Sequence, residues 1–265
     1  MAHPDHARWG QPAPGDPVEA WARQRGWHLG RNVSRRPLAH LRGPTYGPRD
    51  HLVLPVAAWG THHDRPVLGM RFEHRWTAQV HYGSTASNTR RRGTTSGVHQ
   101  VALVAMEAPA PLPDLGVYKR IGTVRRFLAR LSGQSVASGG IDLGDVAGAD
   151  RFRVESTQEA FARWFLTADV FQTIVRQRGV GSGGFFPAAQ PDYEFFFTFT
   201  GRIVLVWCLI PPPLVAAYNG LDVVDTAVAT AYWLGGRVPQ QAYGPPSGWP
   251  GVPPGPTVQD LVAQL

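Results

Sequence analysis

The sequence predicts an α+β domain in which an antiparallel sheet of about five to seven strands is covered by helices. Aromatic and β-branched residues fill the segment 193–210, which is typical of buried strands. Two further strand-like runs, at 52–59 and 66–76, flank a short polar turn. Apolar residues recur at helical spacing in 157–178 and 214–234. A barrel-like sheet closed by a terminal helix is the alternative architecture.

The segment YEFFFTFTGRIVLVWCLIPPP, at 193–213, predicts a buried β-hairpin. A membrane-spanning helix needs about 20 apolar residues and tolerates a central arginine badly. Gly201-Arg202 interrupts this run and three prolines stop it. Two strands of about eight residues that turn at Thr200-Gly201 fit better, because glycine supplies the turn. Cys208, in the second strand, is expected to be a small buried hydrophobe.

A short helix is expected at 17–25, near the beginning of the chain. Asp16 can cap it, Pro17 suits its first position, and Gly26 closes it. Trp21 on this helix and Trp27 after it should anchor the helix to the core.

The first part of the sheet is predicted to contain three strands, at 52–59, 66–76 and 98–107. Between the second and third, the polar segment 77–97 is expected to form a long exposed loop. The proline-rich segment 108–113 is expected to end the third strand, because proline has no amide hydrogen to donate.

Helices are expected at 121–131, 157–178 and 214–234, and a short strand at 152–154. The middle helical segment is either one bent helix or two. Sheet and helices should meet through Phe195, Phe197, Phe199, Val204, Val206, Phe161, Phe165 and Leu221.

The domain organisation follows from composition. Residues 1–16 are expected to be disordered, and 17–238 should form the α+β domain, with a Gly-rich subdomain junction near 132–148. Seven prolines and four glycines in 239–256 predict an irregular linker. The segment 257–265 regains an amphipathic pattern.

The uneven distribution of charge indicates what kind of partner the protein could bind. Residues 1–133 hold 19 Lys and Arg against 8 Asp and Glu, whereas 134–265 hold 7 against 11. The basic half favours an anionic partner.

One cysteine excludes an internal disulfide and suits a reducing compartment. Without a signal peptide or an 18-residue apolar run, we expect a cytoplasmic protein with no transmembrane segment. Lys119 is the only lysine among 26 basic residues, which indicates a high-GC bacterial genome.

No catalytic, metal or cofactor signature emerges. Gly179–Gly184 has the letters of a dinucleotide-binding loop, but a helix precedes it where a strand is required. His62, His63, Asp64, His74 and His81 form the densest histidine group, at spacings that favour surface positions over convergent zinc ligands. No cofactor is therefore predicted.

The best basic cluster is formed by arginines around the predicted loop 77–97. Arginines beside Trp76, His81 and Tyr82 could hold single-stranded nucleic acid by charge and stacking, or attract anionic lipid headgroups. A simple solvated loop is the other interpretation. The predicted anion or partner contacts are Arg71, Arg75, Arg90, Arg91 and Arg92.

The C-terminal segment is the second candidate contact. Thr257 and Asp260 resemble a capping box. Its helical face consists of Val258, Leu261, Val262 and Leu265. Nine residues are too few for a stable free helix. The segment could dock on a protein partner, dock on its own domain, or remain disordered.

Several segments together resemble a widespread uncharacterised actinobacterial family grouped with a bacterial domain of unknown function, number 3137. The matching pieces are WARQRGW at 21–27, VLPVAAWGTHHDRPVLGMRFEHRW at 53–76, VALVAMEAPAPLPDLGV at 101–117, IDLGDVAGADRFRVESTQEAFARWFLT at 141–167, and the hairpin and helix at 193–234. The resemblance covers about 17–240. It implies a fold but no activity and no site residues.

The leading functional hypothesis is a non-enzymatic cytoplasmic interaction module that uses the basic loop and the C-terminal segment. An enzyme with an unrecognised active site and a nucleic-acid or anionic-surface binder are the alternatives. Steep salt dependence of binding would favour the last.

Overall fold

The computed structural model describes the greater part of the chain, in ten pieces. These are residues 17–34, 36–37, 51–84, 87–119, 140–147, 149, 152–176, 194–210, 221–237 and 251–265. The predictions for residues 1–16, the helix at 121–131, the glycine motif at 179–184 and most of the linker lie outside these pieces.

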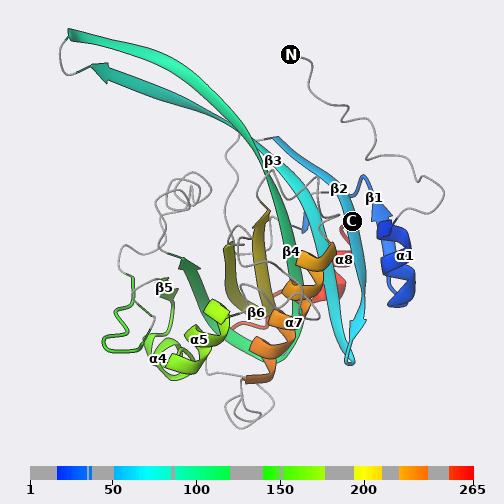
Figure 1. Cartoon of the computed structure of the whole chain (residues 1–265). Helices are drawn as coiled ribbons and strands as arrows, with labels where there is room; N and C mark the ends of the chain where they lie inside the picture. Colours follow the sequence, from blue (N-terminus) through cyan, green and yellow to red (C-terminus); the bar gives the residue numbers. More distant parts are fainter. Residues whose placement is uncertain are drawn as a thin grey trace.

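An antiparallel sheet of six strands forms the centre of the described structure (Figure 1). Neighbouring strands pair in the order β1-β2-β3-β4-β5. β6 pairs with β4 along the edge opposite β3. The predicted α+β class with an antiparallel sheet is confirmed. The bounds are β1 His28–Arg31, β2 His51–His62, β3 Arg65–Ser84, β4 Ser87–Lys119, β5 Phe152–Ser156 and β6 Glu194–Ile210.

The turn between β2 and β3 is a two-residue hairpin loop. His62 pairs with Arg65, and His63 and Asp64 between them have φ of 46° and 65°. Left-handed conformations at both central residues match the twist of the flanking strands, as in a type I′ turn. The predicted polar turn therefore lies where expected, and it is shorter than the gap between the predicted strands at 52–59 and 66–76.

Two predictions for β3 and β4 are wrong. The segment 77–97 is not a loop, because β3 and β4 stay paired until Ser84 opposite Ser87. The prolines of 108–113 do not end the strand, because β4 continues to Lys119. They lie where the ladder with β6 is irregular, between Glu107 and Leu115. A missing amide hydrogen costs little at such a bulge.

The predicted hairpin at 193–213 is also wrong. β6 is a single strand from Glu194 to Ile210, and it pairs with β4 on both sides of Gly201. Gly201 has a φ of 55°. Its left-handed conformation bends the strand rather than reversing it, since Glu107–Leu115 of β4 faces only Phe199–Ile203 of β6. The long partner strand therefore overrides the local turn signal.

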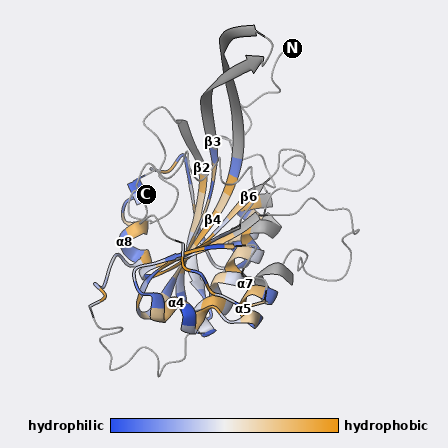
Figure 2. Cartoon of the chain, turned by 90° about the vertical axis from the view of Figure 1, so that its left-hand side faces the viewer, coloured by the Kyte–Doolittle hydropathy of each residue, from blue (hydrophilic) through white to orange (hydrophobic). Residues whose placement is uncertain are grey.

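Within the described ranges, four helices pack on one face of the sheet. They are α1 Pro17–Gln24, α4 Glu159–Phe165, α5 Ala168–Arg176 and α7 Leu221–Arg237. The segment 157–178 thus forms two helices, one of the two alternatives that the spacing left open. The short helix α8, Val258–Val262, packs on the opposite face, and Figure 2 shows the sheet between α8 and α7.

The core under these helices confirms most of the predicted contacts. Phe161, Phe165, Phe197, Phe199, Val204 and Val206 are all buried in this cluster. Phe165 and Phe199 form a T-shaped pair with ring centroids 5.0 Å apart. The side chains of Phe195 and Leu221 lie outside the described part. Cys208 is fully buried, as predicted.

The opposite face of the sheet forms a second apolar cluster. Leu68, Met70 and Phe72 of β3 meet Leu103 of β4 and Trp207 of β6. Val258 and Leu261 of α8 complete this cluster. Within the described residues, no helix has the length and apolar character needed to cross a membrane.

Candidate interaction surfaces

The outer ends of β3 and β4 form a two-stranded extension of the sheet. β2 last pairs with β3 at His51 opposite Arg75, and β6 last pairs with β4 at Ile210 opposite Gln100. From Trp76 opposite Gly97 onward, the two strands pair only with each other among the described residues. We call Trp76–Ser84 and Ser87–Gly97 the ribbon. Figure 1 shows it projecting well beyond the other strands.

The ribbon and its flanks carry charge of one sign. Residues 74–99 contain Arg75, Arg90, Arg91 and Arg92, and no aspartate or glutamate. The register places Arg91 opposite Tyr82 and Arg92 opposite His81. The three consecutive arginines therefore lie near the outer end of the ribbon, and Arg75 lies where the ribbon leaves the sheet.

A buried polar group holds β3 and β4 together below the ribbon. Arg71 is 8% exposed and its Nη2 donates to Oε1 of Gln100 at 2.6 Å. Gln100 pairs in register with Glu73, which is also 8% exposed. Burial lowers the pKa of Arg71, and the neighbouring charge of Glu73 opposes that change. Arg71 therefore ties the base of the ribbon together. The contact roles predicted for Arg71, Arg75, Arg90, Arg91 and Arg92 all stay predictions.

The C-terminal segment lies on its own domain, one of the three alternatives left open. Val258 and Leu261 are 2% and 0% exposed, and Val262 and Leu265 pack partly buried beside them. The amide of Ser34 donates to the carbonyl oxygen of Leu265 at 3.2 Å. Before the helix, the chain at Gly255 packs directly on the backbone of Gly201 in β6.

The start of α8 has the capping box that the sequence predicts. The amide of Asp260 donates to the Thr257 hydroxyl, and the amide of Thr257 donates to Oδ2 of Asp260. These two bonds satisfy amide groups that a helix cannot pair internally. The hydrogen bonds from Thr257 hold the pKa of Asp260 below its ordinary value.

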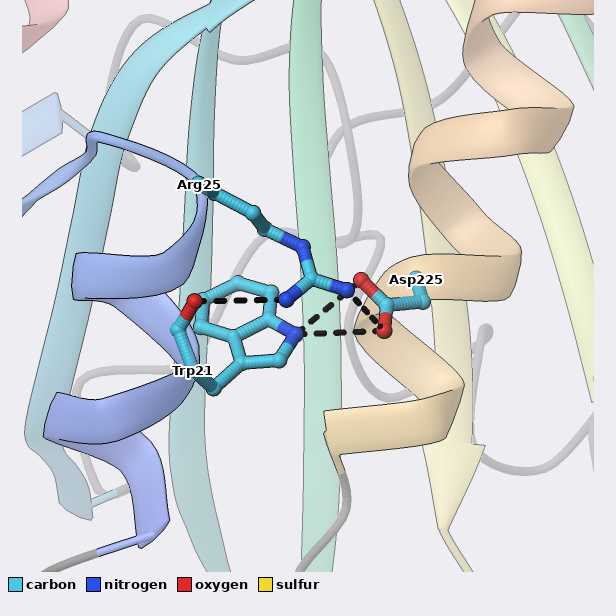
Figure 3. Close-up of polar contacts among 3 residues, drawn as sticks. All are labelled: Trp21, Arg25 and Asp225. Carbon is cyan, nitrogen blue, oxygen red and sulfur yellow. Dashed lines mark hydrogen bonds and ion pairs between the residues drawn. The ribbon is translucent and has the colours of Figure 1, made fainter.

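A polar junction joins α1 to α7 over a separation of 204 residues (Figure 3). Nε1 of Trp21 donates to both carboxylate oxygens of Asp225, at 3.0 and 3.1 Å. Nη2 of Arg25 lies 2.6 Å from the same carboxylate, and the Arg25 guanidinium lies over the Trp21 ring. The predicted anchoring of Trp21 is confirmed, but its partner Asp225 was not foreseen.

His62, the last residue of β2, and His63 in the turn that follows lie beside this junction. The rings of His62 and His63 are 4.5 Å apart, and both approach the ring of Tyr232 in α7. Burial lowers the pKa of His62, and the charges of His63 and Arg25 lower it further. Across the residues that the structure describes, no three His, Cys, Asp or Glu side chains converge as metal ligands.

Comparison with known proteins finds one distant structural similarity. No protein-family model matches the sequence, and no curated protein matches it. Among solved structures, the chain is similar to the mycobacterial trehalose monomycolate transport factor A, TtfA, with a TM-score of 0.45 and 10% sequence identity. The alignment covers 83% of this chain and 91% of that one. The resemblance to domain of unknown function 3137 stays a prediction.

Proposed function

We propose that this protein is a non-enzymatic interaction module that binds an anionic partner through the ribbon. One observation carries the proposal: beyond Trp76 opposite Gly97, β3 and β4 pair only with each other within the described chain. Two strands alone are at most marginally stable in water. Their stabilisation must come from the sheet at their base, so the outer pairs serve contact better than core formation.

The charge of the ribbon defines the kind of partner that we propose. Four arginines without a single acidic residue in 74–99 repel cationic surfaces and attract anionic ones. The arginines at the outer end would meet a partner first. Such a contact strengthens as salt is lowered, because exposed charges are screened beyond about 10 Å at 0.1 M salt.

In this proposal the C-terminal segment packs on its own domain and does not contact the partner. Val258 and Leu261 cover apolar residues of the sheet, among them Phe72 of β3. A partner that bound this segment would first have to remove it from its own domain. We therefore assign the contact to the ribbon rather than to the segment. We place the protein in the cytoplasm, because a chain with one cysteine cannot form an internal disulfide and suits a reducing compartment.

The test compares the full chain with a variant that has a shortened ribbon. Replacing residues 79–94 by Asn-Gly keeps the pair Ala78–Thr95 and supplies a two-residue hairpin turn. Both proteins, tagged alike, are expressed in the source cells, and the size of the native assemblies that contain them is measured. We expect the full chain in larger assemblies and the shortened variant in its free form.

The matched control for this comparison is Leu261→Asp, which disturbs the C-terminal segment and leaves the ribbon intact. Assemblies of unchanged size for the shortened-ribbon variant, together with their loss for Leu261→Asp, would move the contact from the ribbon to the C-terminal segment and overturn the proposal.

A further inference from the structure

We propose that the partner of the ribbon is an anionic lipid surface, on which the ribbon lies with one face toward the membrane. This inference rests on the proposed function and names the class of partner. It follows from how the register of β3 and β4 sorts the residues of the ribbon between its two faces.

Alternation along a strand places every second residue on the same face. One face of the ribbon therefore holds Trp76, Ala78, Val80 and Tyr82 of β3. Their partners in β4 are Gly97, Thr95, Gly93 and Arg91. We call this the aromatic face.

The other face of the ribbon is polar throughout. It holds Thr77, Gln79 and His81 of β3, opposite Ser96, Thr94 and Arg92 of β4. The ribbon is thus amphipathic with a period of two residues. At its outer end, Arg91 belongs to the aromatic face and Arg92 to the polar face.

This distribution suits the boundary between lipid headgroups and acyl chains. Trp76 and Tyr82 are the residue types that concentrate at that boundary, because their rings are apolar and each carries one hydrogen-bonding group. Arginines beside them meet the anionic headgroups, and each basic residue near such a surface strengthens binding about fivefold. Amphipathic elements of this kind lie in the plane of the interface.

A nucleic acid explains the arginines but not the segregation of the two faces. Phosphate contacts need charge alone, and stacking needs aromatic rings beside unpaired bases. Neither requires Ala78 and Val80 on the same face as Trp76 and Tyr82. The observations therefore favour the lipid surface, and nucleic-acid binding becomes an outcome of the test.

The experiment measures flotation of the full chain with vesicles of phosphatidylcholine alone and of phosphatidylcholine with phosphatidylglycerol at a ratio of about 3:2. We expect binding to the anionic vesicles only, falling with salt. Replacing Arg90, Arg91 and Arg92 by Gln should weaken it roughly a hundredfold, from about fivefold for each charge. Trp76→Ser combined with Tyr82→Ser should weaken it at unchanged net charge.

The chain offers matched controls for both variants. Arg23, Arg153 and Arg163 have side chains that are 76%, 50% and 49% exposed and lie outside the ribbon. Changing these three to Gln removes the same charge and should leave most of the vesicle binding. Trp164, 43% exposed in α4, is the control for the aromatic face. Unchanged thermal unfolding of each variant shows that its domain is folded.

Two outcomes overturn the lipid inference. One is binding to anionic vesicles that the ribbon variants and the control variants weaken equally. The other is no vesicle binding, with a single-stranded oligonucleotide bound through the ribbon instead. In the second case, ribbon-dependent assemblies in cells would still support the proposed function. If the assemblies are also unaffected by shortening the ribbon, the proposed function fails as well.

Discussion

Nε1 of Trp21 in α1 donates to both carboxylate oxygens of Asp225 in α7. This contact joins the first described helix to the last helix on the same face of the sheet. Arg25, which directly follows α1, binds the same carboxylate with an Nη2–Oδ2 distance of 2.6 Å. One side chain of α7 thus holds α1 by a hydrogen bond to an indole and an ion pair to a guanidinium.

Removing the Asp225 carboxylate should loosen α1. Asp225→Ala leaves the part-buried indole N–H of Trp21 without its acceptor, which costs about 1–3 kcal/mol. Asp225→Asn keeps an acceptor oxygen and should cost less. Urea denaturation measures the free energy of unfolding of both variants. Glu19→Gln is the control, because Glu19 and Arg23 form an exposed pair within α1, for which about 0.5 kcal/mol is expected. An Asp225→Ala variant no less stable than this control would contradict the assignment.

This junction shows where prediction from the sequence stops. The prediction that Trp21 anchors a helix at 17–25 needed only local signals, such as Pro17 at its first position and Gly26 after its end. The identity of the partner of Trp21 depends on how α1 and α7 come together after 204 residues of chain. No local pattern encodes that approach, so Asp225 was not predicted as the partner.

The free energy of unfolding should fall as the pH drops below neutral, because protonation of His62 favours the unfolded chain. Burial and the charges of His63 and Arg25 lower its pKa in the folded protein from an ordinary value of 6.5. The unfolded chain therefore takes up a proton at a higher pH than the folded protein. This contribution to stability is complete above pH 6.5 and is lost as pH falls toward the lower folded pKa.

Unfolding in urea between pH 5 and 8 tests this prediction. His62→Gln should flatten the pH dependence relative to the natural chain. His63→Gln removes one of the charges that lower the pKa of His62, so it should keep a weaker dependence. Identical pH profiles for the natural chain and His62→Gln would show that His62 is not the group responsible.

The C-terminal segment should detach before the domain unfolds. Leu261 is fully buried, and truncating such a leucine to alanine costs about 2–5 kcal/mol. The loss cannot exceed the free energy that holds the segment on the domain, because the segment then detaches. In Leu261→Ala, hydrogen exchange should therefore accelerate in 257–265 and at the Ser34 amide, but not in β4. Gln259→Ala, at an exposed position of α8, should leave exchange unchanged. Acceleration throughout β4 would show instead that the segment unfolds only with the sheet.

Gly201 should tolerate no side chain. Its φ of 55° strains any other residue, and an added Cβ would lie 2.9 Å from the Cα of Gly255 and from the carbonyl oxygen of Pro254. Gly201→Ala should therefore destabilise the protein by about 1–3 kcal/mol and loosen the C-terminal segment. Gly236→Ala in α7 is the control, since nothing lies within 4 Å of its added Cβ and alanine favours the helix. Equal effects at the two positions would contradict this account.

Gly201 also explains the main error in predicting the fold. A glycine between two apolar runs favours a hairpin, because two-residue hairpin turns require a positive φ that glycine adopts easily. Here the long strand β4 offers partners on both sides of Gly201, so β6 continues. Phe197 and Val206 still lie in the same core cluster, because the alternation of β6 shifts by one residue between Phe199 and Val204. The ribbon was missed for a different reason: its two strands are neighbours in the chain, but residues 77–97 are mostly polar and lack the apolar alternation that predicts a strand.

The central claim, that the ribbon is the contact surface, is tested most directly by site-specific photo-crosslinking in the source cells. A photoreactive residue replaces Ala78 or Thr95 on the aromatic face of the ribbon, and Arg163 in α4 serves as the control position. We predict adducts from both ribbon positions, which no longer form when lysates are irradiated at raised salt, and none from Arg163. Adducts from Arg163 with none from Ala78 or Thr95 would contradict the claim.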